Sequence, residues 1–402
     1  MTAEKTKERT ARAVVGVDLH PASFAAAVTS GESASEMKVE RRFTKMDCAS
    51  WDAWLERGIP KGSTVVVEAS GNSFEFAKTA QRHGHKAVVL DSVSVGRIAK
   101  AYCKNDPKDA VRIAKIYLCG LAESVWIPDE ATRTARELSA AYERAVKDQT
   151  RSNNRLKMFL NGRRIRLKKG QELSQEATRR WLRLSFKWTA EHEGILDGMF
   201  SDYDHAAEQK MKMHRLMAKA VLGNQAIAQL MRLCGIRIVN AYTLLSAIGD
   251  IERFASPEKL IAYLGLAPTI IQSGEKSYSG GLQEGGRRVV KSKLIQAAQS
   301  ILRSKSASGR KLKEWGIKLM MRKSKNLAVA AIARKLAVAV WYALKGFLPD
   351  ILDTEKDLQT KMLGIARTLR LDFVKKLGYS TTRQFADEYT QVILMASGGG
   401  GG

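Results

Sequence analysis

Short apolar runs punctuate the first third of the chain, and the segments between them have the spacing of amphipathic helices. The runs are rich in Val and Ala and are bounded by polar or Gly-containing turns, which is typical of strands. They predict five strands, at residues 13–20, 23–30, 38–44, 63–70 and 86–91. Three strands in succession, then alternating helices and strands, indicate an α/β domain over residues 13–128 with one central sheet.

After about residue 129 the pattern becomes helical. The first part is long, charged and nearly free of Gly and Pro, which predicts an extended helical hairpin or coiled coil. Beyond it we expect a mainly α-helical domain with a Gly-rich stretch, a helical extension, and an added glycine tail. We expect a disordered N-terminus at residues 1–12 and the helical hairpin or coiled coil at residues 129–228. The mainly α-helical domain covers residues 229–348, the helical extension residues 349–397 and the glycine tail residues 398–402.

The chain is strongly basic, with 67 Lys and Arg against 41 Asp and Glu and a formal net charge of +26. Almost all of this excess lies after residue 150. A one-sided positive field suits a polyanion, because each Lys or Arg that meets a phosphate releases condensed counterions. Membrane binding would require a compact basic helix, whereas this charge is spread widely. Composition therefore favours nucleic acid as a partner and disfavours a membrane.

Other features narrow the class of protein. The polar start is not a signal peptide, and the most apolar stretch, residues 326–348, is interrupted by Arg334 and Lys335, as expected of a core helix. The four cysteines are scattered without a CxxC pair, which disfavours a zinc site. We expect reduced thiols, as is usual in the cytosol. The sequence has no GxxxxGK[ST] motif, so we expect no ATP-dependent step.

Four carboxylates are the leading candidates for chemistry. Asp18 and Glu68 follow apolar strands, and Asp106 and Asp109 lie at positions i and i+3 at a helix start. Each has a structural interpretation, since Asp106 before a proline is a good N-cap and Asp109 complements the helix dipole. Their combination in this order is what a ribonuclease-H-like nuclease fold requires. Such oxygen ligands suit Mg²⁺ or Mn²⁺, and two ions would stabilise the attacking and leaving oxygens of phosphoryl transfer.

Ser273, in the sequence QSGEKSYSGG, is a candidate nucleophile in a flexible Gly-rich loop. An unaided serine is a weak nucleophile and needs a metal or a base. On the residues alone a Ser-Gly turn is the more common interpretation.

Basic residues beside aromatics suggest a nucleic-acid surface, because guanidinium planes and aromatic rings stack on bases. A charge run of this kind is also typical of a solvated face, so both interpretations stay open. The candidates are Arg163, Arg164, Arg166, Lys168, Lys169, Arg179, Arg180, Arg183, Lys276, Arg287, Arg288, Arg322, Lys323 and Lys325.

The segments VGVDLH, VVVEASGNS and KNDPKDAVRIAKI, followed by RSNNRLKMFL and the stretch from GIRIVNAYTLLSAIGD to NLAVAAIARKLAVAVWYAL, together resemble the DEDD-type transposases of the insertion sequence 110 family. Members of that family are bridge-RNA-guided recombinases. The resemblance covers roughly residues 13–345 in the family's order.

This resemblance implies a RuvC-like domain that binds Mg²⁺ or Mn²⁺ through Asp18, Glu68, Asp106 and Asp109. It also implies a transposase domain whose Ser273 attacks DNA and forms a phosphoserine link. A non-coding bridge RNA would pair with donor and target DNA, in a dimer or tetramer whose active sites combine parts of different subunits.

Two alternatives remain open. A RuvC-like nuclease or junction resolvase would hydrolyse DNA with water and would not need Ser273. A non-enzymatic RNA- or DNA-binding protein would use the acidic residues only for structure, although carboxylates at the ends of apolar strands are costly without a partner.

Overall fold

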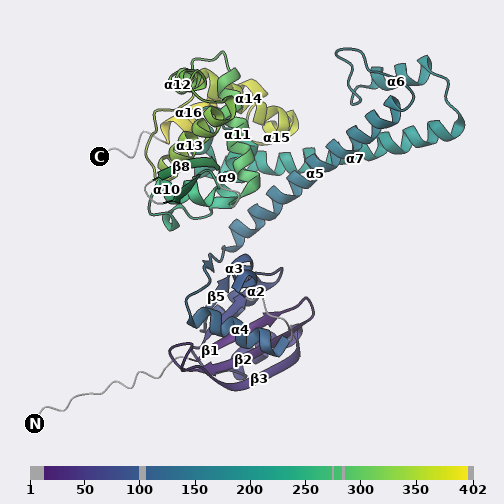
Figure 1. Cartoon of the computed structure of the whole chain (residues 1–402). Helices are drawn as coiled ribbons and strands as arrows, with labels where there is room; N and C mark the ends of the chain where they lie inside the picture. Colours follow the sequence, from purple (N-terminus) through teal and green to yellow (C-terminus); the bar gives the residue numbers. More distant parts are fainter. Residues whose placement is uncertain (1–12, 99–105, 274–275, 283–285, 397–402) are drawn as a thin grey trace, which may run out of the picture. The chain divides into compact units, whose positions relative to one another are not determined.

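The computed structural model describes residues 13–98, 106–273, 276–282 and 286–396 (Figure 1). The chain divides into two compact units, Met1–Asp129 and Glu130–Gly402.

A six-stranded mixed sheet forms the centre of the N-terminal unit, in the order β3-β2-β1-β4-β5-β6. The strands are β1 (Val14–Leu19), β2 (Ser23–Ser30), β3 (Lys38–Asp47), β4 (Thr64–Glu68), β5 (Lys86–Leu90) and β6 (Ser124–Val125). The first three form an antiparallel meander, β1, β4 and β5 are parallel neighbours, and β6 is antiparallel to β5. The sheet confirms the predicted α/β, ribonuclease-H-like N-terminal domain.

Helices cover both faces of this sheet (Figure 1). They are α1 (Trp51–Arg57), α2 (Ser73–Arg82), α3 (Ser92–Ile98) and α4 (Asp106–Leu118). Successive side chains of a strand point to opposite faces, so Val15 packs against Trp54 and Phe76 on the α1 and α2 side. Val14 packs with Ile113 on the α4 side. The sheet is therefore the middle of three layers.

Two long antiparallel helices open the C-terminal unit and form an arm (Figure 1). The arm consists of α5 (Glu130–Asn161), α6 (Glu176–Ser185) and α7 (Ala190–Ala220). Its distal end has a small core of its own, where Leu160, Leu182 and Phe200 are buried together. The arm confirms the long helical middle of the predicted fold.

The rest of this unit is mainly helical, as predicted. Its elements are α8 (Gln225–Met231), α9 (Ile238–Ile248), α10 (Pro257–Tyr263), β7 (Pro268–Ser273), β8 (Lys276–Leu282), α11 (Arg288–Arg303), α12 (Arg310–Met320), α13 (Lys325–Leu344), α14 (Glu355–Leu369), α15 (Leu371–Lys376) and α16 (Thr382–Met395).

Helix α13 is long and apolar enough to cross a membrane by length and composition alone. In the structure its side chains Ala333, Leu336 and Val340 are buried in the main core of the unit. Leu358 of α14 and Phe385 of α16 belong to the same core. The helices after residue 349 therefore pack with those of residues 229–348 around one centre.

Candidate active site

Two carboxylates stand at the ends of neighbouring strands in the N-terminal unit. Asp18 is the last but one residue of β1 and Glu68 is the last residue of β4. These strands run parallel, with Val17 opposite Val67. The next residue of each strand is a carboxylate, so Asp18 and Glu68 lie side by side at the carboxyl edge of the sheet, as the strand order predicts.

The loops that follow these two strands are tied together. Asn72, after β4, donates a hydrogen bond of 2.9 Å to the carbonyl of His20, after β1. The imidazole Nε2 of His20 lies 3.4 Å from Oδ2 of Asp18, whose side chain is only 19% exposed. His20 thus faces the edge of the sheet that carries Asp18 and Glu68, which we call the carboxylate edge. Sequence reasoning missed it, although its place two residues after Asp18 was a usable signal.

Helix α4 lies directly on β1 because Gly16 has no side chain. A Cβ at Gly16 would stand 2.0 Å from the carbonyl oxygen of Ala110 and 2.8 Å from the amide nitrogen of Ala114. No side chain fits in that space. The glycine therefore brings the first turns of α4 over the strand that carries Asp18, and Asp109 immediately precedes the contact residue Ala110.

The two acidic residues of α4 differ in what the structure describes. Asp109 Oδ1 pairs with Arg112 Nη1 at 2.7 Å, and both side chains are 24% exposed. Asp106 is the first residue of α4, but its side chain lies outside the described residues. The structure thus places the α4 acids at the helix start, as the sequence predicts.

The carboxylate edge supplies the hard oxygen donors that suit a divalent ion. Within the described side chains, which exclude that of Asp106, no group of three His, Cys, Asp or Glu residues is arranged to hold a metal. The arrangement of the backbone, however, brings acid-bearing elements together as a site for such an ion requires. Two strand ends lie side by side, and a third acid-bearing element is fixed over them by Gly16.

Ser273 lies at the end of a strand rather than in the flexible Gly-rich loop expected from the sequence. It closes β7, which pairs with β8 in an antiparallel hairpin, and its register partner is Lys276. The side chains of Ser273 and Lys276 lie outside the described residues. The apolar residues Ile270 and Ile271 before Ser273 were the strand signal, and the glycines that follow obscured it.

The base of this hairpin is closed by two glycines in contact. Gly286 has a φ of +85°, and a Cβ there would lie 2.6 Å from the Cα of Gly265. Both the left-handed backbone and the close approach require glycine. The contact fixes the chain before β7 against the chain after β8.

Basic candidates on the arm fall into two groups. Arg179 donates two hydrogen bonds of 2.6 Å to Asp204, and Arg183 donates to Asp197. The bond from Arg179 holds the pKa of Asp204 below its usual value. Another set carries no carboxylate partner among the described residues: Arg163, Arg164, Arg166, Lys168, Lys169 and Arg180.

The aromatic residues near these bases serve the arm's own core. Trp188 donates its Nε1 hydrogen to the carbonyl of Leu182 at 2.9 Å and stacks with Phe159 at 6.1 Å. Trp181 meets Phe186 edge to face at 5.4 Å. These contacts hold the rings against each other, which favours the structural interpretation of the aromatics over base stacking.

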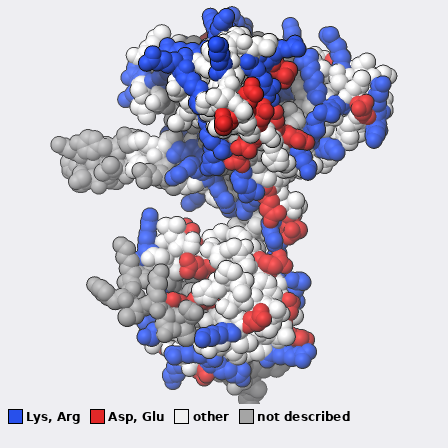
Figure 2. Space-filling view, turned by 90° about the vertical axis from the view of Figure 1, so that its right-hand side faces the viewer, with Lys and Arg blue, Asp and Glu red and all other residues white. Residues whose placement is uncertain are grey.

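The remaining basic candidates lie on the core of the C-terminal unit, where Figure 2 shows Lys and Arg over much of the visible face around a smaller acidic group. Arg322, Lys323 and Lys325 are exposed at the turn from α12 to α13. Arg287 and Arg288 are exposed at the start of α11, immediately after the hairpin.

Two models of known protein families match this chain, one over the N-terminal unit and the first helix of the arm and one in the C-terminal unit. The model of the IS110 transposases of DEDD type matches residues 15–164, and the model described as Transposase IS116/IS110/IS902 family matches residues 227–314. The chain belongs to this family of transposases. The first match spans the carboxylate edge and the second spans the hairpin that carries Ser273.

Curated transposases are similar to this one over most of their length. The transposase for insertion sequence element IS1111A of Coxiella burnetii is 25% identical over 295 residues, which cover 71% of this chain and 78% of that protein. The transposase for IS1328 of Yersinia enterocolitica is 22% identical over 334 residues, covering 82% and 95% respectively. The transposase is therefore an enzyme that acts on DNA, and its DEDD domain implies a divalent metal.

Proposed function

We propose that this transposase breaks and rejoins DNA through a covalent phosphoserine intermediate at Ser273. A divalent ion, Mg²⁺ or Mn²⁺, would be held by Asp18, Glu68, Asp106 and Asp109. The observation that carries the metal site is the packing of α4 on Gly16, beside two strand ends that carry carboxylates. The serine is supported by its position at the tip of a hairpin whose base is fixed.

In the proposed step the hydroxyl oxygen of Ser273 attacks a phosphorus of the DNA backbone. A serine–phosphate bond forms, one phosphorus–oxygen bond of the DNA breaks, and the leaving DNA oxygen takes up the serine proton and becomes a hydroxyl. A hydroxyl of a second strand then reverses the exchange and releases the serine. Because each exchange replaces one phosphate ester by another, the strands rejoin without ATP. A bound divalent ion supplies Lewis-acid stabilisation of the phosphate charge.

The proposal includes a non-coding bridge RNA as guide and a homodimer or homotetramer as the working assembly, in the cytoplasm. Its support is the broad basic surface of the C-terminal unit together with the exposed Arg163, Arg164 and Arg166 just after α5. Such a surface suits backbone contacts, while base pairing between RNA and DNA would read sequence.

The test is recombination between a donor and a target plasmid, with the element's flanking non-coding RNA supplied. The parent is compared with Ser273→Ala and with Ser279→Ala, a matched control in β8 of the same hairpin. We expect joined products and a covalent protein–DNA adduct on denaturing gels with the parent and the control, and neither with Ser273→Ala. Metal-dependent cutting that survives in Ser273→Ala without an adduct would instead indicate a hydrolytic nuclease.

The carboxylates need a separate control. Asp18→Asn and Glu68→Gln should abolish both products and adduct, whereas Asp52→Asn, an exposed acid on α1 that contacts His83, should retain them. Full activity in Asp18→Asn would refute the metal site and leave the acids a structural role.

A further inference from the structure

A cleft of about 510 Å³ in the C-terminal unit is lined by residues of α5, α9 and the start of α11. Helix α9 packs against both of the others (Figure 1). The basic residues of the lining are Arg136, Arg144, Lys147, Arg287 and Arg288. The acid of the lining, Glu143, is neutralised from within, because its Oε1 lies 2.6 Å from Nζ of the buried Lys293. The cleft is thus strongly positive.

Among the described residues no carboxylate pairs with Arg144, Lys147, Arg287 or Arg288. All four are exposed. Like charges in one concave site repel one another, and field lines focused between low-dielectric walls attract an anion. A concave site of this charge suits a polyanionic ligand.

A chain of hydrogen bonds fixes one wall of the cleft. Arg136 donates to the carbonyls of Ser246 (2.9 Å) and Ala247 (3.0 Å) at the end of α9. Tyr263 donates to the same Ala247 carbonyl at 3.0 Å, and Arg287 Nε donates to the Tyr263 hydroxyl at 3.0 Å. Arg287 is consequently held in place before any ligand arrives, which lowers the entropic cost of binding.

The helix start at this wall has no internal counter-charge either. Helix α11 carries no acidic residue in its first turn and no side-chain cap; its N-cap residue is Arg287 and its first residue is Arg288. Cations at a helix N-terminus are unfavourable because the free N–H groups already carry positive partial charge. Both features become favourable when an anion occupies the cleft.

The cleft also lies at the base of the Ser273 hairpin. Gly286 lines it, and the same glycine contacts Gly265, three residues before β7 begins. A ligand in the cleft would therefore meet the part of the chain from which the hairpin emerges.

We propose that this cleft binds the phosphodiester backbone of a nucleic-acid strand, with Arg144 and Lys147 of α5 acting together with Arg287 and Arg288. The sequence pattern of α5 did not single out its two basic residues. That the bound strand leads to Ser273 rests on the proposed function, whereas the binding itself does not.

The experiment measures binding of the full chain to a fluorescent DNA duplex and to an RNA duplex of the same sequence over a series of salt concentrations. The cleft variant is Arg144→Gln/Lys147→Gln. The matched control is Arg151→Gln/Arg155→Gln on the same helix, where the arginines pair with Asp148 and Asp202 at 3.1 and 3.6 Å. Thermal unfolding of each variant checks the fold.

We expect the cleft variant to bind about tenfold more weakly and its log–log salt slope to fall by about two, one for each lost phosphate contact. The control keeps the parent's affinity and slope. A loss with DNA alone identifies DNA as the source of the backbone, and a loss with RNA alone identifies RNA. Parent-like binding by the cleft variant, or an equal loss in the control, would overturn the proposal.

A second measurement needs no variant. Acylation of lysines in the parent should be suppressed at Lys147 when the duplex is added, while Lys157, exposed further along α5, reacts as before. Equal reactivity of Lys147 with and without duplex would contradict binding in the cleft. Ser273→Ala should bind the duplex like the parent. The binding experiments therefore test the cleft separately from the serine mechanism, and either proposal can fail without the other.

Discussion

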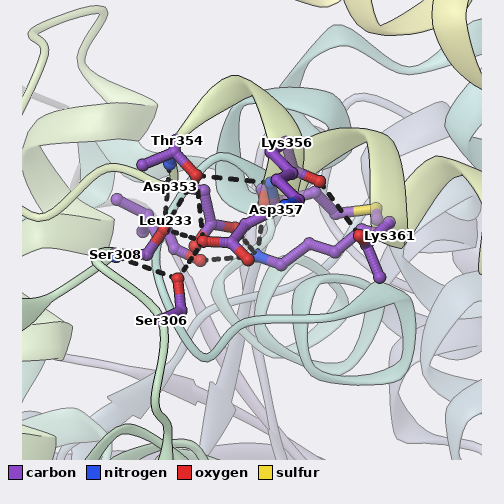
Figure 3. A network of polar contacts seen from close by, with 10 residues as sticks. Leu233, Ser306, Ser308, Asp353, Thr354, Lys356, Asp357 and Lys361 are labelled. Carbon is purple, nitrogen blue, oxygen red and sulfur yellow. Dashed lines mark hydrogen bonds and ion pairs between the residues drawn. The ribbon is translucent and has the colours of Figure 1, made fainter.

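The cleft beside α11 and the polar network around Asp353 and Lys361 are both rich in charged side chains, but their charges are matched differently. In the network (Figure 3) Lys361 pairs with Asp353, and the two side chains are only 7% and 4% exposed. Lys361 also donates to the carbonyls of Met231 (2.7 Å) and Leu233 (2.8 Å). In the cleft, Arg144 and Lys147 face solvent without a carboxylate partner among the described residues.

This difference separates charges that serve folding from charges that serve a ligand. Burial lowers the pKa of Lys361 and raises that of Asp353, because each ion loses its hydration and regains stability only from the other and from nearby hydrogen bonds. The network joins α14 to the segment after α8, so its charges are matched by groups within the protein. Arg144, Lys147, Arg287 and Arg288 of the cleft keep their hydration, and no acid of the part of the chain that the structure describes pairs with them. Charge density alone therefore does not identify a binding surface.

The largest expected effect comes from breaking the buried pair. Lys361→Met leaves the Asp353 carboxylate buried without its cation, which should lower the free energy of unfolding by about 3–5 kcal/mol. Urea denaturation monitored by circular dichroism measures this change. The salt slope of DNA binding should stay at the parent's value.

The double variant Lys361→Met/Asp353→Leu is the control for that substitution. Removing both charges should recover a large part of the lost stability, since no uncompensated ion remains. If the double variant is as unstable as the single one, the carbonyl contacts of Lys361, rather than the ion pair, carry the stability of the network.

The next effect concerns the shape of the cleft rather than its charge. Gly286→Ala places a Cβ against Gly265 in a left-handed backbone, and overpacking of this kind costs about 1–3 kcal/mol. We expect lower stability and weaker duplex binding, measured by urea denaturation and fluorescence anisotropy. Gly281→Ala in β8, where an added Cβ meets nothing within 4 Å, should change neither. Unchanged binding in Gly286→Ala would show that the cleft tolerates movement of the hairpin base.

The features predicted from the sequence are those that short segments specify. Apolar runs gave the strands, and the position of Asp18 and Glu68 after two of them gave the carboxylate edge. Other features depend on distant partners. The acid that pairs with Arg179 lies 25 residues away, and Arg136 meets Ala247 across 111 residues. Neither partner can be read from a local pattern, so a solvated face, an internal ion pair and a binding cleft look alike.

A smaller effect tests this distinction on the arm. Arg179→Gln removes a cation that is already matched by Asp204, so it should lower stability by about 1 kcal/mol and leave the salt slope unchanged. The adjacent Arg180→Gln removes an exposed cation and should leave stability unchanged. Denaturation and duplex titrations measure both. A slope that falls by about one in Arg179→Gln would mean that its pairing with Asp204 gives way to phosphate.

The smallest effect is the pH dependence contributed by Asp357 at the edge of the network. Burial acts to raise its pKa, but hydrogen bonds from Ser306, Ser308 and Thr354, with the nearby Lys361, outweigh this and lower it. Because the folded-state pKa lies below the unfolded value of about 4, the carboxylate stabilises the folded protein at neutral pH, and this contribution is lost as the pH falls through the lowered value. Asp357→Asn should therefore be less stable than the parent at pH 7. The difference in unfolding free energy should shrink below about pH 4. Asp353 contributes in the opposite direction; its pKa is raised mainly by burial, which both proteins share, and to a smaller extent by the Asp357 charge that the variant removes. A difference that stays constant across this range would place the Asp357 carboxylate outside the matched network and weaken the contrast with the cleft.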